Sequence, residues 1–404
     1  MRPASRDLCH LCKGTQNLCG LGYCPLLAKL RVQKKLPEMR IKKEVFGPTP
    51  PGFFVGGHGY PEVYWGPTVS LNNEEAWKMD SPDKWYGLPF DKIVELRSSL
   101  VRSATRSRVN DFSSRYLDRA QDAILSVKTV DVEMKFKREL RAQLVFSSDV
   151  QPMGPSAPLD SFKVVDNPKV PWRVDQLVGE RVKAVDAVKE LWGSGESNYY
   201  LTKLLSAGVL GRNEHRKMVP TRWSLTAVMD MVAKHLMEKI RYYPEIGEYR
   251  IYSSEYLHNH YEILLMPGMW EYEDFEAWAP GSIWAGGSHD FRIVEEHEPF
   301  QGRTRYADKE RGGYYAARLG ICEGLDVIRR QARAIVFREI YEGYVVPVGV
   351  WQVLEGARHA MRGKPKKFSS RQEALDYLKT RLRIPIPNYF KESRILRQRR
   401  LTEF

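Results

Sequence analysis

The chain has 404 residues and a mass of 46.8 kDa, which is long enough for two or three domains with a substantial core. Its 43% hydrophobic and 11% aromatic residues exclude a disordered chain, and no apolar run approaches the roughly 20 residues that a membrane span needs. The net charge of +13 favours polyanionic partners. The first residues lack the apolar core of a signal peptide, so we expect an intracellular, cytoplasmic protein without membrane contact.

Four of the five cysteines fall within the first 24 residues, in the order Cys-x2-Cys-x6-Cys-x4-Cys. In a reducing cytoplasm this spacing predicts a tetrahedral structural Zn²⁺ site. Three alternatives stay open: an iron–sulfur cluster, two disulfides, or a zinc site in which His10 replaces one cysteine. The fifth cysteine, Cys322, has apolar neighbours in a predicted helix, and we expect it to be buried. The predicted zinc ligands are Cys9, Cys12, Cys19 and Cys24.

The next part of the chain predicts mixed structure. Glycine and proline crowd residues 47–70, which favours short strands joined by turns. Apolar residues at helical spacing predict a helix from Val174 to Trp192 and another from Leu225 to Leu236. The second is preceded by Pro220-Thr221-Arg222-Trp223-Ser224, a helix-start sequence. Between the glycine- and proline-rich stretch and the first of these helices, we expect a helix at 91–108 and strands at 131–137 and 143–147.

The chain then changes to strands, followed by helices. A long helix without proline is predicted from Tyr314 to Ile340, and a final helix near Ser370, where Ser370 and Glu373 have capping-box spacing. Pro385 and Pro387 end that helix and are expected to release a basic tail. The four strands are predicted at Tyr249–Ser253, Tyr261–Met266, Trp270–Trp278 and Phe291–Glu295.

The predicted fold class is mixed α+β, in a multi-domain body with a small zinc module and a flexible tail. The predicted parts are a four-cysteine zinc module at 1–30, an N-terminal α/β body at 31–245, a C-terminal strand-then-helix domain at 246–387 and a basic tail at 388–404.

The tail ends in Gln398-Arg-Arg-Leu-Thr-Glu-Phe404. A 3₁₀-like turn has about three residues per turn, so Leu401 and Phe404 would share one side, with Gln398 one turn earlier. This pattern resembles the short peptide with which replication and repair proteins bind the sliding clamp (PCNA). The usual clamp peptide has two adjacent aromatic residues, whereas this sequence stops after the first. The alternative is a basic helix whose Leu401 and Phe404 pack on the protein's own core.

Four features together resemble the archaeal Nre family over essentially the whole chain. They are the four-cysteine segment, the block Phe54-Val-Gly-Gly-His-Gly-Tyr-Pro61, the run Arg216-Lys-Met-Val-Pro-Thr-Arg-Trp-Ser-Leu-Thr-Ala-Val228 and the terminal peptide. The resemblance implies a role in DNA repair with the sliding clamp as partner. It implies no particular reaction and no catalytic residue.

Two basic segments are candidates for contact with nucleic acid. Arg216, Lys217 and Arg222 lie just before and at a predicted helix start, where backbone N–H groups favour anions. Trp223 could stack on a base, or it could lie in the core beside a purely structural helix cap. The other segment is expected to be either a nucleic-acid face or a solvated helix face, and it contains Arg303, Arg305, Arg311 and Arg318 among tyrosines.

Five of the nine histidines lie between residues 235 and 297. With nearby carboxylates such as Glu255, Glu262, Asp290 and Glu295, they could form a hydrolytic metal site. No His-Glu-x-x-His or comparable spacing supports such a site, and His258 and His260 also suit a half-buried strand edge.

Three hypotheses for function follow. The leading one is a DNA repair factor that binds the clamp through its terminal peptide and contacts DNA through its basic body. The second is a nuclease, glycosylase or nucleotide-transferring enzyme with a phosphate site around Arg216–Ser224. The third is an adaptor that bridges the clamp and another protein, which would show no salt-dependent affinity for DNA.

Overall fold

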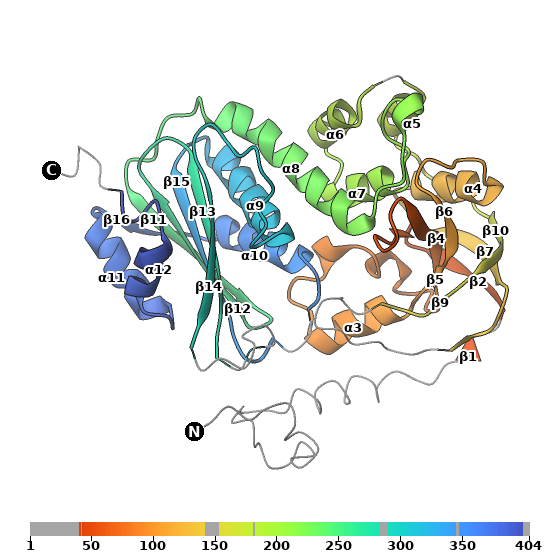
Figure 1. The fold of residues 1–404 in the computed structure, drawn as a ribbon, viewed down its shortest axis with the longest axis horizontal. Helices are drawn as coiled ribbons and strands as arrows, with labels where there is room; N and C mark the ends of the chain where they lie inside the picture. Colours follow the sequence, from red (N-terminus) through yellow and green to blue (C-terminus); the bar gives the residue numbers. More distant parts are fainter. Residues whose placement is uncertain are drawn as a thin grey trace, which may run out of the picture. The chain divides into compact units, whose positions relative to one another are not determined.

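The computed structural model describes residues 40–41, 43–141, 153–180, 182–280, 282, 290–344 and 347–398. These residues divide into two compact units, each of which combines helices with strands (Figure 1). The N-terminal unit comprises the described residues within Gln33–Val145 and Pro152–Val232, and the C-terminal unit those from Ala233 onward. The predicted α+β class is confirmed. The predicted domain boundaries, the zinc module and the terminal peptide tail stay predictions.

The strands of the N-terminal unit form small sheets. One has the order β10-β7-β2, a second has the order β3-β4-β5-β9 with β6 paired to β4, and a short pair joins β1 and β8. The strand predicted at 131–137 is confirmed as β7, whose residues are alternately buried and more exposed. The strands are β1 (Arg40–Ile41), β2 (Glu44–Thr49), β3 (Phe53–Val55), β4 (Glu62–Ser70), β5 (Leu100–Ser103), β6 (Thr105–Arg108), β7 (Val130–Phe136), β8 (Leu140–Arg141), β9 (Ser156–Ala157) and β10 (Leu159–Val164).

The helices of this unit differ from the prediction in two places. The helix predicted at 91–108 is wrong beyond Ser98, because β5 and β6 follow it and both pair with β4. The helix predicted from Val174 to Trp192 is two helices. The strand predicted at 143–147 lies outside the described residues. The helical segments are η2 (Ala76–Lys78), η3 (Pro82–Lys84), α3 (Phe90–Ser98), α4 (Arg115–Ile124), α5 (Trp172–Gly179), α6 (Ala184–Gly193), α7 (Asn198–Ser206), η4 (Asn213–His215) and the start of α8 (Thr221–Ile240).

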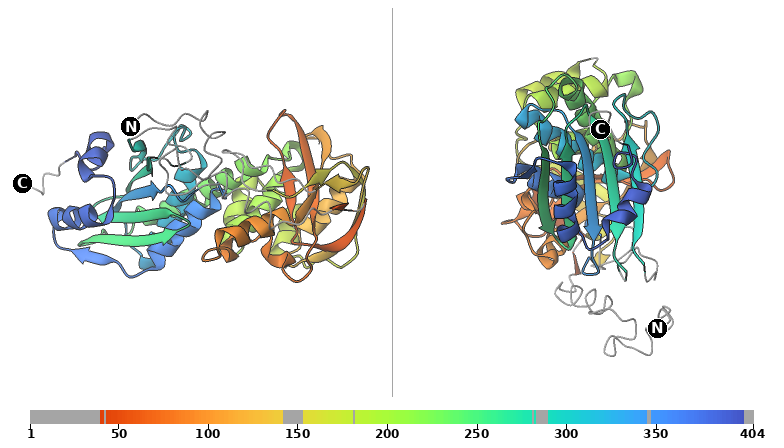
Figure 2. Two further views of the ribbon diagram at one scale, coloured as in Figure 1. Left: turned by 90° about the horizontal axis from the view of Figure 1, so that it is seen from below. Right: turned by 90° about the vertical axis from the view of Figure 1, so that its left-hand side faces the viewer.

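The C-terminal unit is a six-stranded sheet with helices on both faces (Figures 1 and 2). Its strand order is β14-β13-β15-β12-β11-β16, and only the β13–β15 pair is parallel. The four predicted strands are confirmed, with somewhat different ends. Helices α9 (Gly312–Ile328) and α10 (Trp351–Arg362) cover one face, and α11 (Arg371–Arg381) and α12 (Ile386–Glu392) cover the other. The strands are β11 (Tyr249–Tyr256), β12 (Asn259–Met266), β13 (Glu271–Trp278), β14 (Arg292–Glu298), β15 (Arg333–Ile340) and β16 (Lys366–Phe368).

The long helix predicted from Tyr314 to Ile340 is wrong beyond Ile328. Arg329 ends α9 in the left-handed region, with φ of 49°, and the chain then forms β15. This strand lies between β13 and β12, and all eight of its residues are buried. A strand that is covered on both faces has no polar-apolar alternation, so periodicity cannot distinguish it from a buried helix.

The last helices are held on the sheet by buried carboxylates. The carboxylate of Glu339, on β15, accepts hydrogen bonds from the backbone N–H groups of Arg383 and Ile384, both at 2.9 Å, and from the Tyr389 hydroxyl at 3.0 Å. On β12, the buried Glu262 accepts one from the Arg381 guanidinium at 2.9 Å. These bonds replace water around charges that have been removed from solvent.

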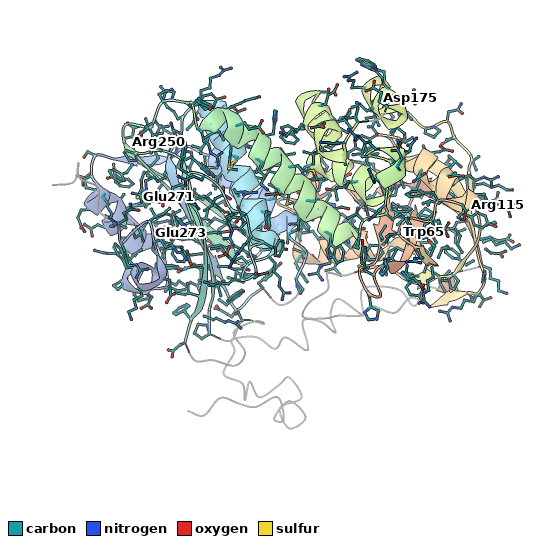
Figure 3. The ribbon with its side chains drawn as sticks, turned by 45° about the horizontal axis from the view of Figure 1, so that its top comes forward. Trp65, Arg115, Asp175, Arg250, Glu271 and Glu273 are labelled. Carbon is teal, nitrogen blue, oxygen red and sulfur yellow. The ribbon has the colours of Figure 1, made fainter. Side chains whose placement is uncertain are left out.

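Glu273 holds the segment that follows α12. Its carboxylate, on β13 (Figure 3), accepts hydrogen bonds from the Ser393 hydroxyl and from the backbone N–H of Arg394, the latter at 2.6 Å. Ile395 and Leu396 are buried beside it. The prediction that Pro385 and Pro387 release a free tail is therefore wrong for residues 386–396, because Pro385 instead precedes α12 and the chain stays on the sheet.

At the opposite face of this sheet, carboxylates and arginines on β13, β14 and β15 meet others on α9 and in the loop before it. Each arginine pairs with one carboxylate: Arg338 with Glu276 at 2.7 Å, Arg318 with Glu298 at 2.5 Å and Arg303 with Glu296 at 2.5 Å. Asp274 and Glu310 are also buried, and no arginine pairs with either among the described residues. Burial raises the pKa of Asp274 to about 7, and the charge of Glu276 acts in the same direction. Burial also raises the pKa of Glu310, and the nearby charge of Asp274 raises it further.

This pair predicts a loss of stability as the pH rises. The pKa of Asp274 is higher in the folded protein than in the unfolded chain, so the folded state binds more protons between about pH 4 and 7. The contribution of Asp274 to the unfolding free energy should fall across that range, by at most about 1.4 kcal/mol per pH unit. Asp274→Asn should flatten this dependence in denaturant unfolding curves measured at several pH values. A slope equal to that of the unmodified chain would contradict the assignment. Asp160→Asn serves as the control, because Asp160 is exposed on β10.

Candidate nucleic-acid interface

Two segments that are far apart in the sequence meet in the N-terminal unit. The backbone N–H of Val55, on β3, donates to the hydroxyl of Thr221, the first residue of α8, at 2.9 Å. Gly57 faces Pro220, and a Cβ added to this glycine would lie 3.7 Å from the proline Cβ. At the hairpin turn, Gly59 has φ of 82°, a conformation that favours glycine. The glycine-rich block and the helix-start run therefore form one structural feature.

This feature places two aromatic rings side by side at the surface. The ring centres of Tyr60 and Trp223 are 5.1 Å apart, with an angle of 52° between the ring planes. Tyr60 is 45% exposed and Trp223 is 50% exposed, so Trp223 does not lie in the core. The adjacent Arg222 is also exposed. An exposed aromatic pair beside a cation suits stacking on bases. We call these two residues the Tyr60–Trp223 pair.

Arg216 has a structural role that the sequence did not indicate. Its guanidinium donates to the carbonyl of Gly211 at 3.0 Å and to the carbonyl of Val178, close to the end of α5. Burial lowers the pKa of this guanidinium. Lys217 is exposed instead. Of the predicted phosphate-binding group, the structure thus places Lys217, Arg222 and Trp223 at the surface, while Arg216 is hydrogen-bonded within the unit.

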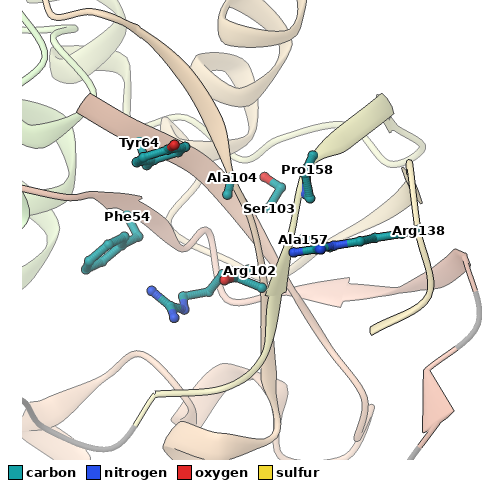
Figure 4. A pocket seen from close by; sticks show the side chains of 9 residues that line it. Phe54, Tyr64, Arg102, Ser103, Ala104, Arg138, Ala157 and Pro158 are labelled. Carbon is teal, nitrogen blue, oxygen red and sulfur yellow. The ribbon is translucent and has the colours of Figure 1, made fainter. Parts of the chain in front are cut away.

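A pocket of about 380 Å³ lies beside the β3–β4 hairpin and is lined by this hairpin together with β5 and β9 (Figure 4). Its walls include Phe54, Tyr64, Arg102, Arg138 and Pro158. The Arg102 guanidinium is turned toward Phe54, 4.8 Å from its ring centre. Burial lowers the pKa of Arg102 to about 10, so the side chain stays positively charged at neutral pH. Sequence reasoning missed this pocket because Arg102 lies in the stretch that was predicted to be a helix.

Comparisons with known proteins identify the family of this chain. Residues 18–285 match the family described as Archaeal Nre, N-terminal, and residues 298–404 match Archaeal Nre, C-terminal. The chain belongs to the archaeal Nre family. It is similar to DNA repair protein NreA of Archaeoglobus fulgidus, with 39% identity over 91% of this chain and 92% of that protein.

Two other Nre proteins are similar over most of their length. DNA repair protein NreB of Archaeoglobus fulgidus is 34% identical over 98% of this chain and 99% of its own length. DNA repair protein NreA of Haloferax volcanii is 33% identical over 82% of this chain and 81% of its own length. No solved structure matches the chain.

In this Nre-family chain, the arginines predicted on a second nucleic-acid face lie in different environments. Arg318 is only 1% exposed and pairs with Glu298, so the prediction that it lies at the surface is corrected. Arg303 is half-buried and pairs with Glu296. Arg305 and Arg311 are exposed. The sequence spacing does not reveal this difference, because the ion pairs join Arg318 on α9 and Arg303 in the loop before it to glutamates on β14.

The histidine metal site that the sequence left open without supporting ligand spacing does not assemble in the described part of the C-terminal unit. The Nε2 atoms of His260 and His297 each lie 2.8 Å from one carboxylate, that of Glu262 and that of Glu271, respectively. His289 lies outside the described residues. Among the residues that the structure describes, no group of three or more His, Cys, Asp or Glu side chains is arranged to hold a metal ion.

The remaining predicted sites lie largely beyond the described ranges. Cys9, Cys12, Cys19, Cys24, Leu401 and Phe404 are all outside them, and Gln398 is the last described residue and is exposed. Cys322 is buried, as predicted. No helix in the described ranges is long and apolar enough to cross a membrane.

Proposed function

We propose that this chain is a DNA repair protein that contacts single-stranded DNA through its N-terminal unit and binds the sliding clamp through its C-terminal peptide. The observation that carries the DNA contact is the exposed Tyr60–Trp223 pair beside Arg222. Similar members of the family bear the name DNA repair protein. The protein would act at sites of DNA damage or replication.

Single-stranded DNA fits this surface better than an intact duplex. A ring can stack on a base only where the base is not already stacked between its neighbours, as in single strands and distorted sites. The net charge of +13 adds attraction to the phosphates. A dedicated phosphate pocket around Arg216–Ser224, as an enzyme would need, has less support, because the Arg216 guanidinium is hydrogen-bonded to two carbonyls.

Replacing Trp223 tests the DNA contact. Trp223→Ala should weaken the binding of a single-stranded oligonucleotide by about 5- to 150-fold, since stacking of one base contributes about 1–3 kcal/mol. Fluorescence anisotropy of a labelled oligonucleotide measures this affinity. Trp172→Ala is the matched control, because Trp172 is 76% exposed in the same unit but lies on α5. Equal losses in the two variants would contradict a specific role for the Tyr60–Trp223 pair.

Shortening the C-terminus tests clamp binding. A chain that ends at Arg397 lacks Gln398, Leu401 and Phe404 but keeps the segment that Glu273 holds on the sheet. We expect this chain to fold normally and to lose measurable affinity for the cognate sliding clamp in calorimetry. Phe404→Ala should show the same loss, whereas Thr402→Ala should not. Undiminished affinity in the shortened chain would remove this part of the proposal.

The four-cysteine segment supports a structural zinc site as part of the proposal. Cys9, Cys12, Cys19 and Cys24 would supply four thiolates to one ion. Elemental analysis of protein purified without chelator should find about one zinc per chain, and Cys12→Ser together with Cys24→Ser should lower that content. Cys322→Ser is the control, because this buried cysteine lies in α9. Iron in place of zinc would contradict the proposal and favour a cluster.

A further inference from the structure

The pocket beside the β3–β4 hairpin has the charge of an anion-binding site. Of the side chains named on its walls, Arg102 and Arg138 are cationic, and the remaining lining residues are neutral. Within the described ranges, neither arginine forms an ion pair with a carboxylate. Arg102 instead donates to the carbonyl of Gly154, at 3.2 Å from one guanidinium nitrogen and 3.4 Å from another. Among the described residues, then, no carboxylate neutralises either of these two charges, unlike those of Arg303, Arg318 and Arg338.

The other side of the pocket is aromatic. Phe54, on β3, lies next to the Arg102 guanidinium, and Tyr64 projects from β4 with its side chain exposed (Figure 4). Aromatic rings and a guanidinium plane are the surfaces on which nucleobases stack. Pro158 closes the wall opposite the aromatic residues. The pocket thus combines a place for a planar ring with two cations for a negative group.

The volume limits what the pocket can hold. About 380 Å³ is near the lower end of the range for small-molecule sites, which is roughly 300–1,000 Å³. A single nucleotide is a ligand of about that size that combines a planar ring with an anionic group. A double helix would not enter a cavity of this volume.

We propose that this pocket binds one nucleotide, with its phosphate near Arg102 and Arg138 and its base against Phe54 and Tyr64. The nucleotide could be free or part of a strand. The strand form rests on the proposed DNA contact, because the same hairpin carries Tyr60 at its turn and Tyr64 four residues later. A strand that stacks on the Tyr60–Trp223 pair would then deliver a neighbouring nucleotide to the pocket.

The test uses the full chain with three variants and three probes. Arg138→Glu reverses a pocket charge, and Tyr64→Ala removes a ring; both side chains are exposed, so neither change should impair folding. Lys163→Glu is the matched charge control, because Lys163 lies on β10 and is exposed. The probes are 5′-dAMP, inorganic phosphate and a single-stranded decamer of thymidylate. Unchanged melting temperatures confirm folding.

The expected result is a loss of nucleotide affinity that depends on position. Arg138→Glu should weaken 5′-dAMP binding at least tenfold in calorimetry, and Lys163→Glu less than twofold. Tyr64→Ala should weaken 5′-dAMP binding without changing the binding of phosphate, since phosphate has no ring to stack. If the unmodified chain binds only the decamer, at least tenfold losses in both pocket variants assign the site to a nucleotide within a strand.

The outcomes separate this inference from the proposed function. In one outcome, the decamer binds and Trp223→Ala weakens its binding, while Arg138→Glu and Tyr64→Ala have no more effect than Lys163→Glu. This outcome overturns the pocket and leaves the DNA contact standing. If 5′-dAMP binds in a pocket-dependent way and the decamer does not bind, the pocket stands and the DNA contact fails. Binding of neither probe overturns both.

Discussion

The C-terminal unit depends on the requirement that a buried charge must have partners. Its sheet carries carboxylates on both faces, and an isolated carboxylate in a dry interior costs several kcal/mol. Glu262 meets this requirement with a donor from the last residue of α11, and Glu273 and Glu339 with donors from the segment after that helix. Two of the three bond to backbone N–H groups, which any sequence except proline would supply. These charges therefore constrain the backbone path of the segment more than they constrain which residues it contains.

The same requirement distinguishes arginines that contribute to structure from those available to a ligand. On the opposite face of the sheet, Arg303, Arg318 and Arg338 each pair with a glutamate, so their charges are used within the unit. In the N-terminal unit, Arg102 and Arg138 form no such pairs among the described residues. Net charge counts all of these arginines equally. A polyanion is attracted most strongly to arginines that are not already held in an ion pair. The partners of each arginine therefore identify such a surface, whereas the total number of arginines does not.

Local sequence patterns were sufficient to predict a segment's secondary structure where that structure depends mainly on neighbouring residues in the sequence. The strands from Tyr249 to Glu295 were predicted from their composition, and Ser370 caps α11 by accepting from the N–H of Glu373 at 3.2 Å. The Glu373 carboxylate accepts in return from the backbone N–H of Ser370, as in a capping box, and also from Ser369. Prediction failed for β15, because only pairing with β13 and β12 makes that apolar run a strand.

The candidate site shows the same limit. Trp223 and Arg222 could be selected from the helix-start run because the first turn of a helix is exposed at its N-terminus. Tyr60 and the pocket could not, since the contacts that create them join residues far apart in the sequence, as in the pairs Tyr60–Trp223 and Phe54–Arg102. Arg216 was misassigned for a related reason: its acceptor at Val178 lies 38 residues earlier.

The docked C-terminal segment changes how clamp binding would work. Leu396 is buried, and the N–H of Gln398 still donates to the carbonyl of Arg394 at 3.3 Å. The proposed clamp peptide therefore begins within the docked segment and not at the end of a long arm. Effective concentration falls as a flexible linker lengthens beyond the distance that it must span. A peptide that starts next to the sheet would hold the clamp close to the C-terminal unit, so Glu273, which fixes that starting point, would influence where the clamp sits without contacting it.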